Sequence, residues 1–159
     1  MRWTVFDSPI GELSVAVDDT AVCGLHFGRV ESAGTVAVDA LSGQAVAELA
    51  GYFAGELTGF TVPVAARRGS DFERAVWREM TRIPYGETVT YGEVATALGD
   101  PGAARAVGVA CNRNPIPVIV PCHRIVGAGG KLVGFGGGLP RKVHLLELEA
   151  RVAFQRAWS

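Results

Sequence analysis

Three prolines crowd the segment 114–126, which reads Asn-Pro-Ile-Pro-Val-Ile-Val-Pro-Cys-His-Arg-Ile-Val, and they restrict the backbone there more than anywhere else in the chain. Each proline fixes its own φ, lacks an N–H, and biases the preceding residue towards extended geometry. The apolar, β-branched run 118–120 favours burial. The sequence therefore predicts a stiff, extended and buried support that leads into a turn at 122–124.

Cys122, which begins this turn, has two interpretations. A free cysteine packs like a small hydrophobic residue, so it can be purely structural. A thiolate is a nucleophile, and a nearby imidazole or guanidinium lowers the thiol pKa, so the adjacent His123 and Arg124 favour a reactive cysteine. A Cys-His pair alone does not decide between them.

The composition limits the classes of protein to which this chain can belong. With 159 residues, 48% of them hydrophobic, the chain can form one domain or two small ones around a core. It has no apolar run of about 18 residues and no signal-peptide pattern, so we expect no membrane segment. Its three cysteines, Cys23, Cys111 and Cys122, fit reduced thiols in the cytoplasm. Cys23 with His26 is at most half of a metal site, so we expect no metal.

The charge is unevenly distributed. Residues 1–68 carry 4 Lys/Arg against 8 Asp/Glu, a net charge of −4. Residues 69–159 carry 11 against 8, a net charge of +3. The second half is therefore the one suited to a phosphate backbone, with modest, salt-sensitive affinity.

Residues 1–68 are predicted to form a small α+β supporting domain. Strand patterns and turn residues over 1–27 indicate a three-stranded meander, followed by a surface loop. A helix over about 41–54 has Val46, Leu49, Ala50 and Phe53 at i, i+3, i+4 and i+7 on one face. The segment 60–64 reads as a short edge strand.

Residues 69–159 are predicted to form a mainly helical domain. Capping boxes at Ser70 and Thr90 open helices that run to about Arg82 and Leu98. Asp100-Pro101 restarts the chain as a helix that reaches about Cys111. Two short helices joined by a tight turn fit a helix-turn-helix, and an ordinary helical hairpin fits as well.

The helix from Gly102 carries mostly Ala and Gly, with Arg105 as its one long charged side chain. Small residues permit close approach either to another molecule or to a neighbouring helix. Further along, we expect a brief strand at 131–133 and a glycine-rich loop at 134–138 that lets backbone or a planar ligand approach closely. Pro140 opens the last helix, and 151–159 is expected to be a poorly ordered tail.

The string Pro-Cys-His-Arg-Ile-Val at 121–126 closely resembles the active-site signature of the O6-alkylguanine-DNA alkyltransferases, also called methylated-DNA–protein-cysteine methyltransferases. Further segments resemble this family in order and spacing, over roughly 70–149. They are Ile83-Pro84-Tyr85-Gly86, Thr90-Tyr91, Ala103-Ala104-Arg105-Ala106-Val107-Gly108, Asn114-Pro115 and Gly136-Gly137-Gly138, with a weaker match at 7–11. Such agreement in register makes coincidence improbable.

The resemblance implies an N-terminal sheet-and-helix domain, then a helical domain with a helix-turn-helix and the active site. It implies a DNA repair protein that binds duplex DNA containing O6-alkylguanine through the minor groove, flips the damaged nucleotide, and takes up the alkyl group irreversibly. Arg105 would fill the gap left by the flipped nucleotide. The residues matched to the family's DNA contacts are Thr90, Ala103, Ala104, Arg105 and Gly108.

The family also implies roles at the reaction site. Cys122 would accept the alkyl group, His123 would act through a water molecule, and Glu149 would orient the histidine. Tyr91 would hydrogen-bond the flipped base, and Asn114 would brace the turn before the cysteine. The residues that would border the pocket are Val133, Phe135, Gly136 and Gly137. An S-alkylcysteine cannot be hydrolysed, so one molecule would act once, as a monomer without a cofactor.

Two features depart from the family pattern. Phe135 stands where many members have tyrosine, so a hydroxyl contact at the pocket border is lost. The zinc ligands that some relatives carry in the N-terminal half are not matched.

Three other functions are compatible with single features of the sequence. A non-catalytic sensor of alkylated DNA would not need Cys122, and a cysteine hydrolase would need an oxyanion hole that no motif provides. A transcription regulator would need base-reading side chains on the helix from Gly102, which has few besides Arg105.

Overall fold

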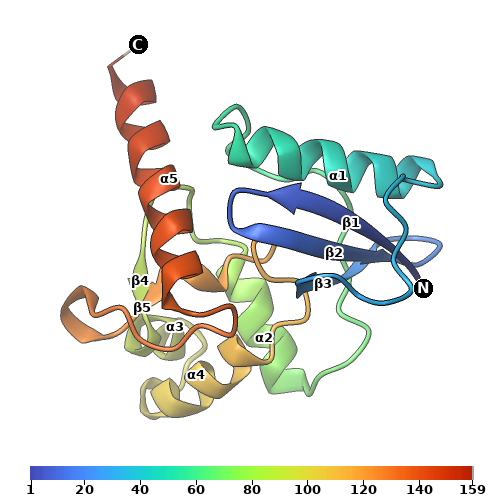
Figure 1. Cartoon of the computed structure of the whole chain (residues 1–159). Coiled ribbons are helices and arrows are strands. Elements are labelled where there is room, and N and C mark those ends of the chain that lie inside the picture. Colours follow the sequence, from blue (N-terminus) through green and yellow to red (C-terminus); the bar gives the residue numbers. More distant parts are fainter. Residues whose placement is uncertain (159) are drawn as a thin grey trace. The chain divides into compact units, whose positions relative to one another are not determined.

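The computed structural model describes residues 1–158, which divide into two compact units, one over Met1–Arg67 and one that begins at Arg68. The sequence prediction placed the boundary after residue 68. The α+β fold class is confirmed, with a small sheet and helix first and a mainly helical part after it (Figure 1). The last residue, Ser159, lies outside the described residues.

The N-terminal unit is an antiparallel sheet in the order β1-β2-β3, as predicted, with one helix over a face (Figure 1). Its elements are β1 (Arg2–Ser8), β2 (Gly11–Val17), β3 (Val22–Phe27) and α1 (Ala40–Phe53). The central strand β2 is buried over its last five residues, so both of its faces are covered. The helix buries Ser42, Ala45, Leu49, Tyr52 and Phe53, whereas Val46 and Ala50 are more exposed than predicted.

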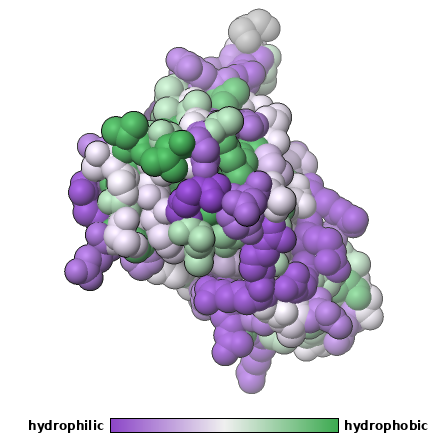
Figure 2. Space-filling model, turned by 90° about the vertical axis from the view of Figure 1, so that its right-hand side faces the viewer, coloured by the Kyte–Doolittle hydropathy of each residue, from purple (hydrophilic) through white to green (hydrophobic). Residues whose placement is uncertain are grey.

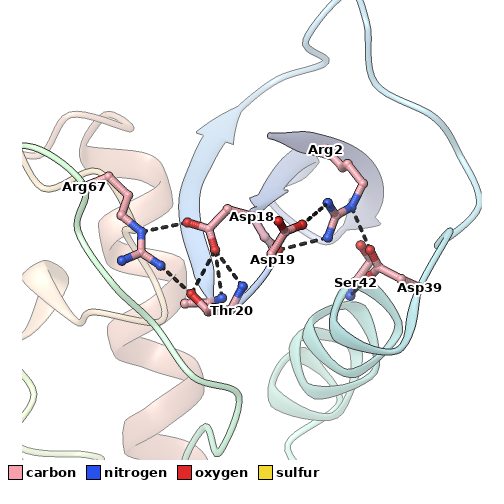
Figure 3. Close-up of polar contacts among 8 residues, drawn as sticks. Arg2, Asp18, Asp19, Thr20, Asp39, Ser42 and Arg67 are labelled. Atoms are coloured by element: carbon pink, nitrogen blue, oxygen red, sulfur yellow. Dashed lines mark hydrogen bonds and ion pairs between the residues drawn. The ribbon is translucent and has the colours of Figure 1, made fainter.

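Two arginines tie the turns of this unit together (Figure 3). Arg2 donates from Nε to Asp39 (2.7 Å), the residue that caps α1, and from Nη1 to Asp19 (3.2 Å). Arg67 donates to Asp18 and Thr20, each at 2.6 Å, and this ion pair lowers the pKa of Asp18. The arginines thereby fasten the β2–β3 turn to the start of α1 and to the end of the unit.

The predicted strand at 60–64 is absent, and this prediction is wrong. A single bridge joins Val64 to Val22. The carboxylate of Glu48 accepts from the N–H groups of Thr61 (2.8 Å) and Val62 (3.0 Å), so these groups are bonded to a side chain and not to a neighbouring strand. Pro63 has no N–H to offer.

The C-terminal unit contains four α-helices within the described residues, α2 (Asp71–Met80), α3 (Tyr91–Ala97), α4 (Ala104–Asn112) and α5 (Leu139–Ala157). Both predicted capping boxes form, at Ser70 and Thr90. After α3 the chain turns at Gly99 and re-enters through the 3₁₀ turn η1 (Pro101–Ala103), which completes the predicted helix-turn-helix. The Asp100 side chain makes no capping hydrogen bond.

A short parallel ladder joins β4 (Val89–Thr90) to β5 (Ile125–Val126) and was not predicted. The predicted strand at 131–133 does not form. The prediction of a poorly ordered tail over 151–159 is also wrong for the described part of that segment, because α5 continues to Ala157, with Val152 buried on the same face as Leu145 and Leu148. Apolar spacing at i, i+3 and i+7 continues that face beyond residue 150.

The face of the molecule drawn in Figure 2 is mostly polar. On this face, hydrophilic residues predominate and hydrophobic residues gather in small groups. Among residues 1–158, no helix has both the length and the hydropathy needed to cross a membrane.

Candidate active site around Cys122

The segment that precedes Cys122 is buried as predicted, but it is not extended. Val118 has φ 73°, unusual for a β-branched residue, and the N–H of Val120 donates to the carbonyl of Ile116 (2.9 Å). The Asn114 side chain holds this turn, since its amide donates to the Val120 carbonyl (2.8 Å) and its oxygen accepts from the Ile116 N–H (3.0 Å). A side chain thus fixes the backbone immediately before Cys122.

Cys122 opens the 3₁₀ turn η2 (Cys122–Arg124), whose three residues are buried. Nε2 of His123 lies 2.7 Å from Oε2 of Glu149 on α5. Arg124 donates to both oxygens of the same carboxylate, at 2.8 Å and 3.0 Å, and to the Ile83 carbonyl (2.8 Å). Local sequence places the histidine and arginine side by side, and tertiary packing brings the carboxylate to both.

The protonation states follow from these contacts. Burial raises the pKa of Glu149, but hydrogen bonds from His123 and Arg124 outweigh this effect and hold the pKa at about 2. Burial lowers the pKa of His123 more than Glu149 raises it, so the ring is neutral near pH 7. Because an ionised carboxylate only accepts, the ring proton belongs on Nε2. Nδ1 is then an acceptor, and it is buried without a hydrogen-bond partner among residues 1–158.

The thiol of Cys122 is not ionised by its surroundings alone. Burial raises its pKa to about 11, although a hydrogen bond from Asn114 and the positive charge of Lys142 act in the opposite direction. A reaction at neutral pH therefore requires a base for the thiol proton, and His123 is the adjacent residue with an acceptor nitrogen.

Lys142 was missed by the sequence reasoning. Its side chain is completely buried, and Nζ donates to the carbonyls of Ile125 (2.6 Å) and Val133 (3.1 Å). Burial lowers its pKa, while the nearby thiols Cys122 and Cys111 raise it. The sequence feature that could have identified Lys142 is its position seven residues before Glu149, which puts both residues on the apolar face of α5. Lys142 connects the backbone after Cys122 to the glycine-rich loop.

Tyr91, the first residue of α3, faces the glycine-rich loop. Its hydroxyl donates to the Val133 carbonyl (3.3 Å), and a Cβ on Gly134 would lie 3.8 Å from that hydroxyl. Burial raises the pKa of Tyr91 to about 12, with smaller contributions from the two neighbouring thiols. Of the predicted pocket residues, Val133 and Gly136 are exposed, Phe135 is half-buried and Gly137 is buried.

The residues predicted to contact DNA lie along the helix-turn-helix. Thr90 caps α3, Ala103 ends η1, and Ala104, Arg105 and Gly108 lie on α4. Arg105 is exposed and Ala104 and Gly108 are half-buried. A Cβ on Gly108 would lie 3.8 Å from the Tyr91 ring, so this glycine links α4 to the site. Among residues 1–158, no cluster of three or more His, Cys, Asp or Glu side chains could hold a metal ion.

Comparisons with known proteins cover both units. Residues 71–151 match the family model described as 6-O-methylguanine DNA methyltransferase, DNA binding domain, and residues 1–66 match the ribonuclease-like domain of the same protein. A methylated-DNA–protein-cysteine methyltransferase of Mycolicibacterium paratuberculosis is 49% identical over 156 residues, which cover 95% of this chain and 93% of that protein. One from Methanosarcina acetivorans is 45% identical over 154 residues, or 94% of this chain and 98% of that protein.

A solved structure is similar in fold as well. The crystal structure of Mycobacterium tuberculosis OGT in complex with DNA superposes with a TM-score of 0.87 at 46% identity, covering 96% of this chain and 94% of that one.

Proposed function

The chain belongs to the 6-O-methylguanine DNA methyltransferase family of DNA repair proteins, which transfer an alkyl group from DNA to a cysteine of their own, and we propose that Cys122 is the acceptor. We propose O6-alkylguanine in duplex DNA as the donor. The observation that carries this assignment is the buried Cys122–His123–Glu149 series, in which an ionised carboxylate fixes a neutral imidazole beside a protonated thiol.

The reaction follows from these states. The thiol proton of Cys122 passes through a water molecule to Nδ1 of His123, and Sγ attacks the alkyl carbon in line with the bond to O6. The S–C bond forms as the C–O6 bond breaks, and its electron pair stays on the guanine. The Tyr91 hydroxyl hydrogen-bonds the departing base, and a returned proton restores the neutral guanine. Asn114 and Lys142 are positioning residues that hold the cysteine turn and the loop.

The product limits the protein to one event. An S-alkylcysteine is a thioether whose carbon carries no good leaving group, so nothing regenerates the thiol. The step is complete without a cofactor. A damage sensor without chemistry is the alternative, and the hydrogen-bonded base beside a cysteine favours transfer over sensing.

We further propose that the helix-turn-helix binds the minor groove with α4 and that the protein acts as a monomer in the cytoplasm. The small side chains of α4 suit a narrow groove. Three cysteines without disulfides among residues 1–158 are compatible with a reducing compartment.

Arg105→Ala is expected to slow transfer from a methylated duplex by about one to two orders of magnitude, because the flipped nucleotide would lose the side chain that fills its place. Transfer from free O6-benzylguanine, which needs no flipping, should be unchanged. Both rates are measured in single-turnover experiments, with Arg82→Ala as an equal loss of charge elsewhere in the unit. A parallel fall on the free base would contradict the flipping role.

The pH dependence of alkyl transfer tests the proposed passage of the Cys122 thiol proton to His123. Because His123 is neutral above its lowered pKa, the rate should be level at and above neutral pH and fall on the acid side, where the imidazole is protonated. In His123→Gln the thiol must ionise unaided, so the rate should be lower and rise about tenfold per pH unit towards the thiol pKa of about 11. Single-turnover rates on O6-benzylguanine between about pH 5 and about pH 9 distinguish the two profiles. Identical profiles would exclude His123 as the base.

A further inference from the structure

A hollow of about 460 Å³ lies where the C-terminal end of α4 meets the N-terminal end of α2, and Asn114 is the one lining residue that has a role in the proposed chemistry. The residues around it are mainly polar: Arg68, Gly69, Glu73, Trp77, Asn112, Arg113 and Asn114.

The frame of the hollow is rigid. Trp77 is 5% exposed, and its indole N–H donates to the Ala110 carbonyl (2.8 Å), which ties α2 to the end of α4. Gly69 has φ 110°, and a Cβ there would lie 2.6 Å from the Trp77 ring. Only glycine allows the backbone to press against this ring, so the neighbouring Arg68 is held at the rim.

The charges around the hollow leave an excess of one positive charge. Arg68 and Arg113 are exposed, and Glu73 is the one carboxylate among the residues around the hollow. Glu73 accepts from the Ser70 N–H (2.9 Å) in the capping box, and this bond is the main cause that lowers its pKa. Nη1 of Arg113 lies 3.6 Å from Glu73, a loose ion pair that leaves the Arg113 side chain 69% exposed.

The hollow continues the proposed DNA-facing surface of α4. Arg105, Val109 and Asn112 are exposed at i, i+4 and i+7, the spacing of one helix face. Arg113 follows as the C-cap of α4, about 12 Å along the axis from Arg105 at 1.5 Å per residue. A duplex that follows α4 from Arg105 therefore passes Arg113, which lines the hollow together with Arg68.

We propose that Arg113 and Arg68 bind a phosphate of the DNA backbone at this hollow, with the Asn112 amide as a further donor. The inference rests on the proposed function, in which α4 faces DNA. Glu73 opposes the phosphate and limits its affinity, so removing the Arg113 and Glu73 charges should have opposite effects.

The test measures binding of an undamaged duplex across a range of salt concentrations. Arg113→Ala should weaken binding about tenfold and reduce the slope of log K against log salt by about one, since one phosphate contact is lost. Arg68→Ala should act in the same direction. Glu73→Gln should strengthen binding, because glutamine keeps the capping hydrogen bond to Ser70 and removes the negative charge. Arg82→Ala, an equal loss of charge beyond the other end of α2, should have a smaller effect.

Equal losses in Arg113→Ala and Arg82→Ala would overturn the inference, as would weaker binding by Glu73→Gln. Transfer from free O6-benzylguanine, which has no phosphate, should be unchanged in all four variants, and a loss there would also overturn it. If the wild-type protein does not accept the alkyl group but Arg113→Ala still lowers the salt slope, the proposed function fails and this site stands. Normal transfer with an unchanged slope removes the phosphate site alone.

Discussion

Cys122→Ser is expected to abolish alkyl transfer, by about three orders of magnitude or more, because a serine hydroxyl is a far weaker nucleophile towards an alkyl carbon. The wild-type protein, mixed with an excess of duplex containing one O6-methylguanine, should gain one methyl group on Cys122 and then stop. Intact-mass measurement followed by peptide mapping reads both the stoichiometry and the residue.

The chain supplies its own control for this experiment. Cys111, on α4, is buried as well, and burial raises its pKa to about 12. No base is bonded to its thiol in the structure of residues 1–158, so Cys111→Ser should leave the transfer intact. Methylation of Cys111, or continued release of methyl groups beyond one per molecule, would refute the assignment of Cys122 as a single-use acceptor. An unmodified protein that binds the lesion tightly would be a sensor.

Glu149→Gln is expected to affect both stability and chemistry. The substitution leaves the buried guanidinium of Arg124 without a counter-charge, which should cost about 3–5 kcal/mol in the free energy of unfolding and lower Tm by about 10 °C. It also removes the anion that fixes the proton of His123 on Nε2, so transfer should slow in the molecules that remain folded. Thermal unfolding by circular dichroism and single-turnover rates below the transition measure the two effects separately.

Glu147→Gln on the same helix is the matched control, since Glu147 is exposed. Equal effects of the two substitutions would show that the buried cluster does not stabilise the fold. The pH dependence provides a further check. The folded pKa of Glu149, about 2, lies below the unfolded value of about 4.3. Its contribution is therefore complete above the unfolded value and is lost as pH falls towards 2. Glu149→Gln should flatten stability across that acid window.

The parts of the fold that could be predicted from the sequence are those that depend on neighbouring residues. The capping boxes at Ser70 and Thr90, and the turn at Cys122, depend on residues within a few positions of one another. The predictions failed where a distant or side-chain partner supplied the hydrogen bonds. Asn114 bends the segment 118–120 that prolines and β-branched residues would extend, and Glu48 replaces a strand partner at 61–62.

The site shows the same division. The local motif and the family resemblance named Cys122 and His123, and the resemblance alone named Glu149, whose carboxylate lies 2.7 Å from the histidine. Lys142 was missed because a lysine on a helix is ordinarily solvated, and only the packing of α5 reveals that its ammonium group is buried against two carbonyls. The face of α4 that borders the hollow beside Trp77 could not be predicted either, because it depends on how α2 and α4 pack.

The short β4–β5 ladder determines at which stage the reaction site loses its conformational entropy. Thr90 ends β4 and caps α3, while Ile125 begins β5 directly after the cysteine turn, so the ladder fixes the Cys122 turn to the helix-turn-helix. The conformational entropy that is lost when the thiol is ordered relative to the helix-turn-helix is then lost once, during folding, and not at each encounter with DNA. An enzyme with many cycles must also open to reset itself. A protein that reacts once has no cycle to complete, so its reaction site can be as rigid as a folded core.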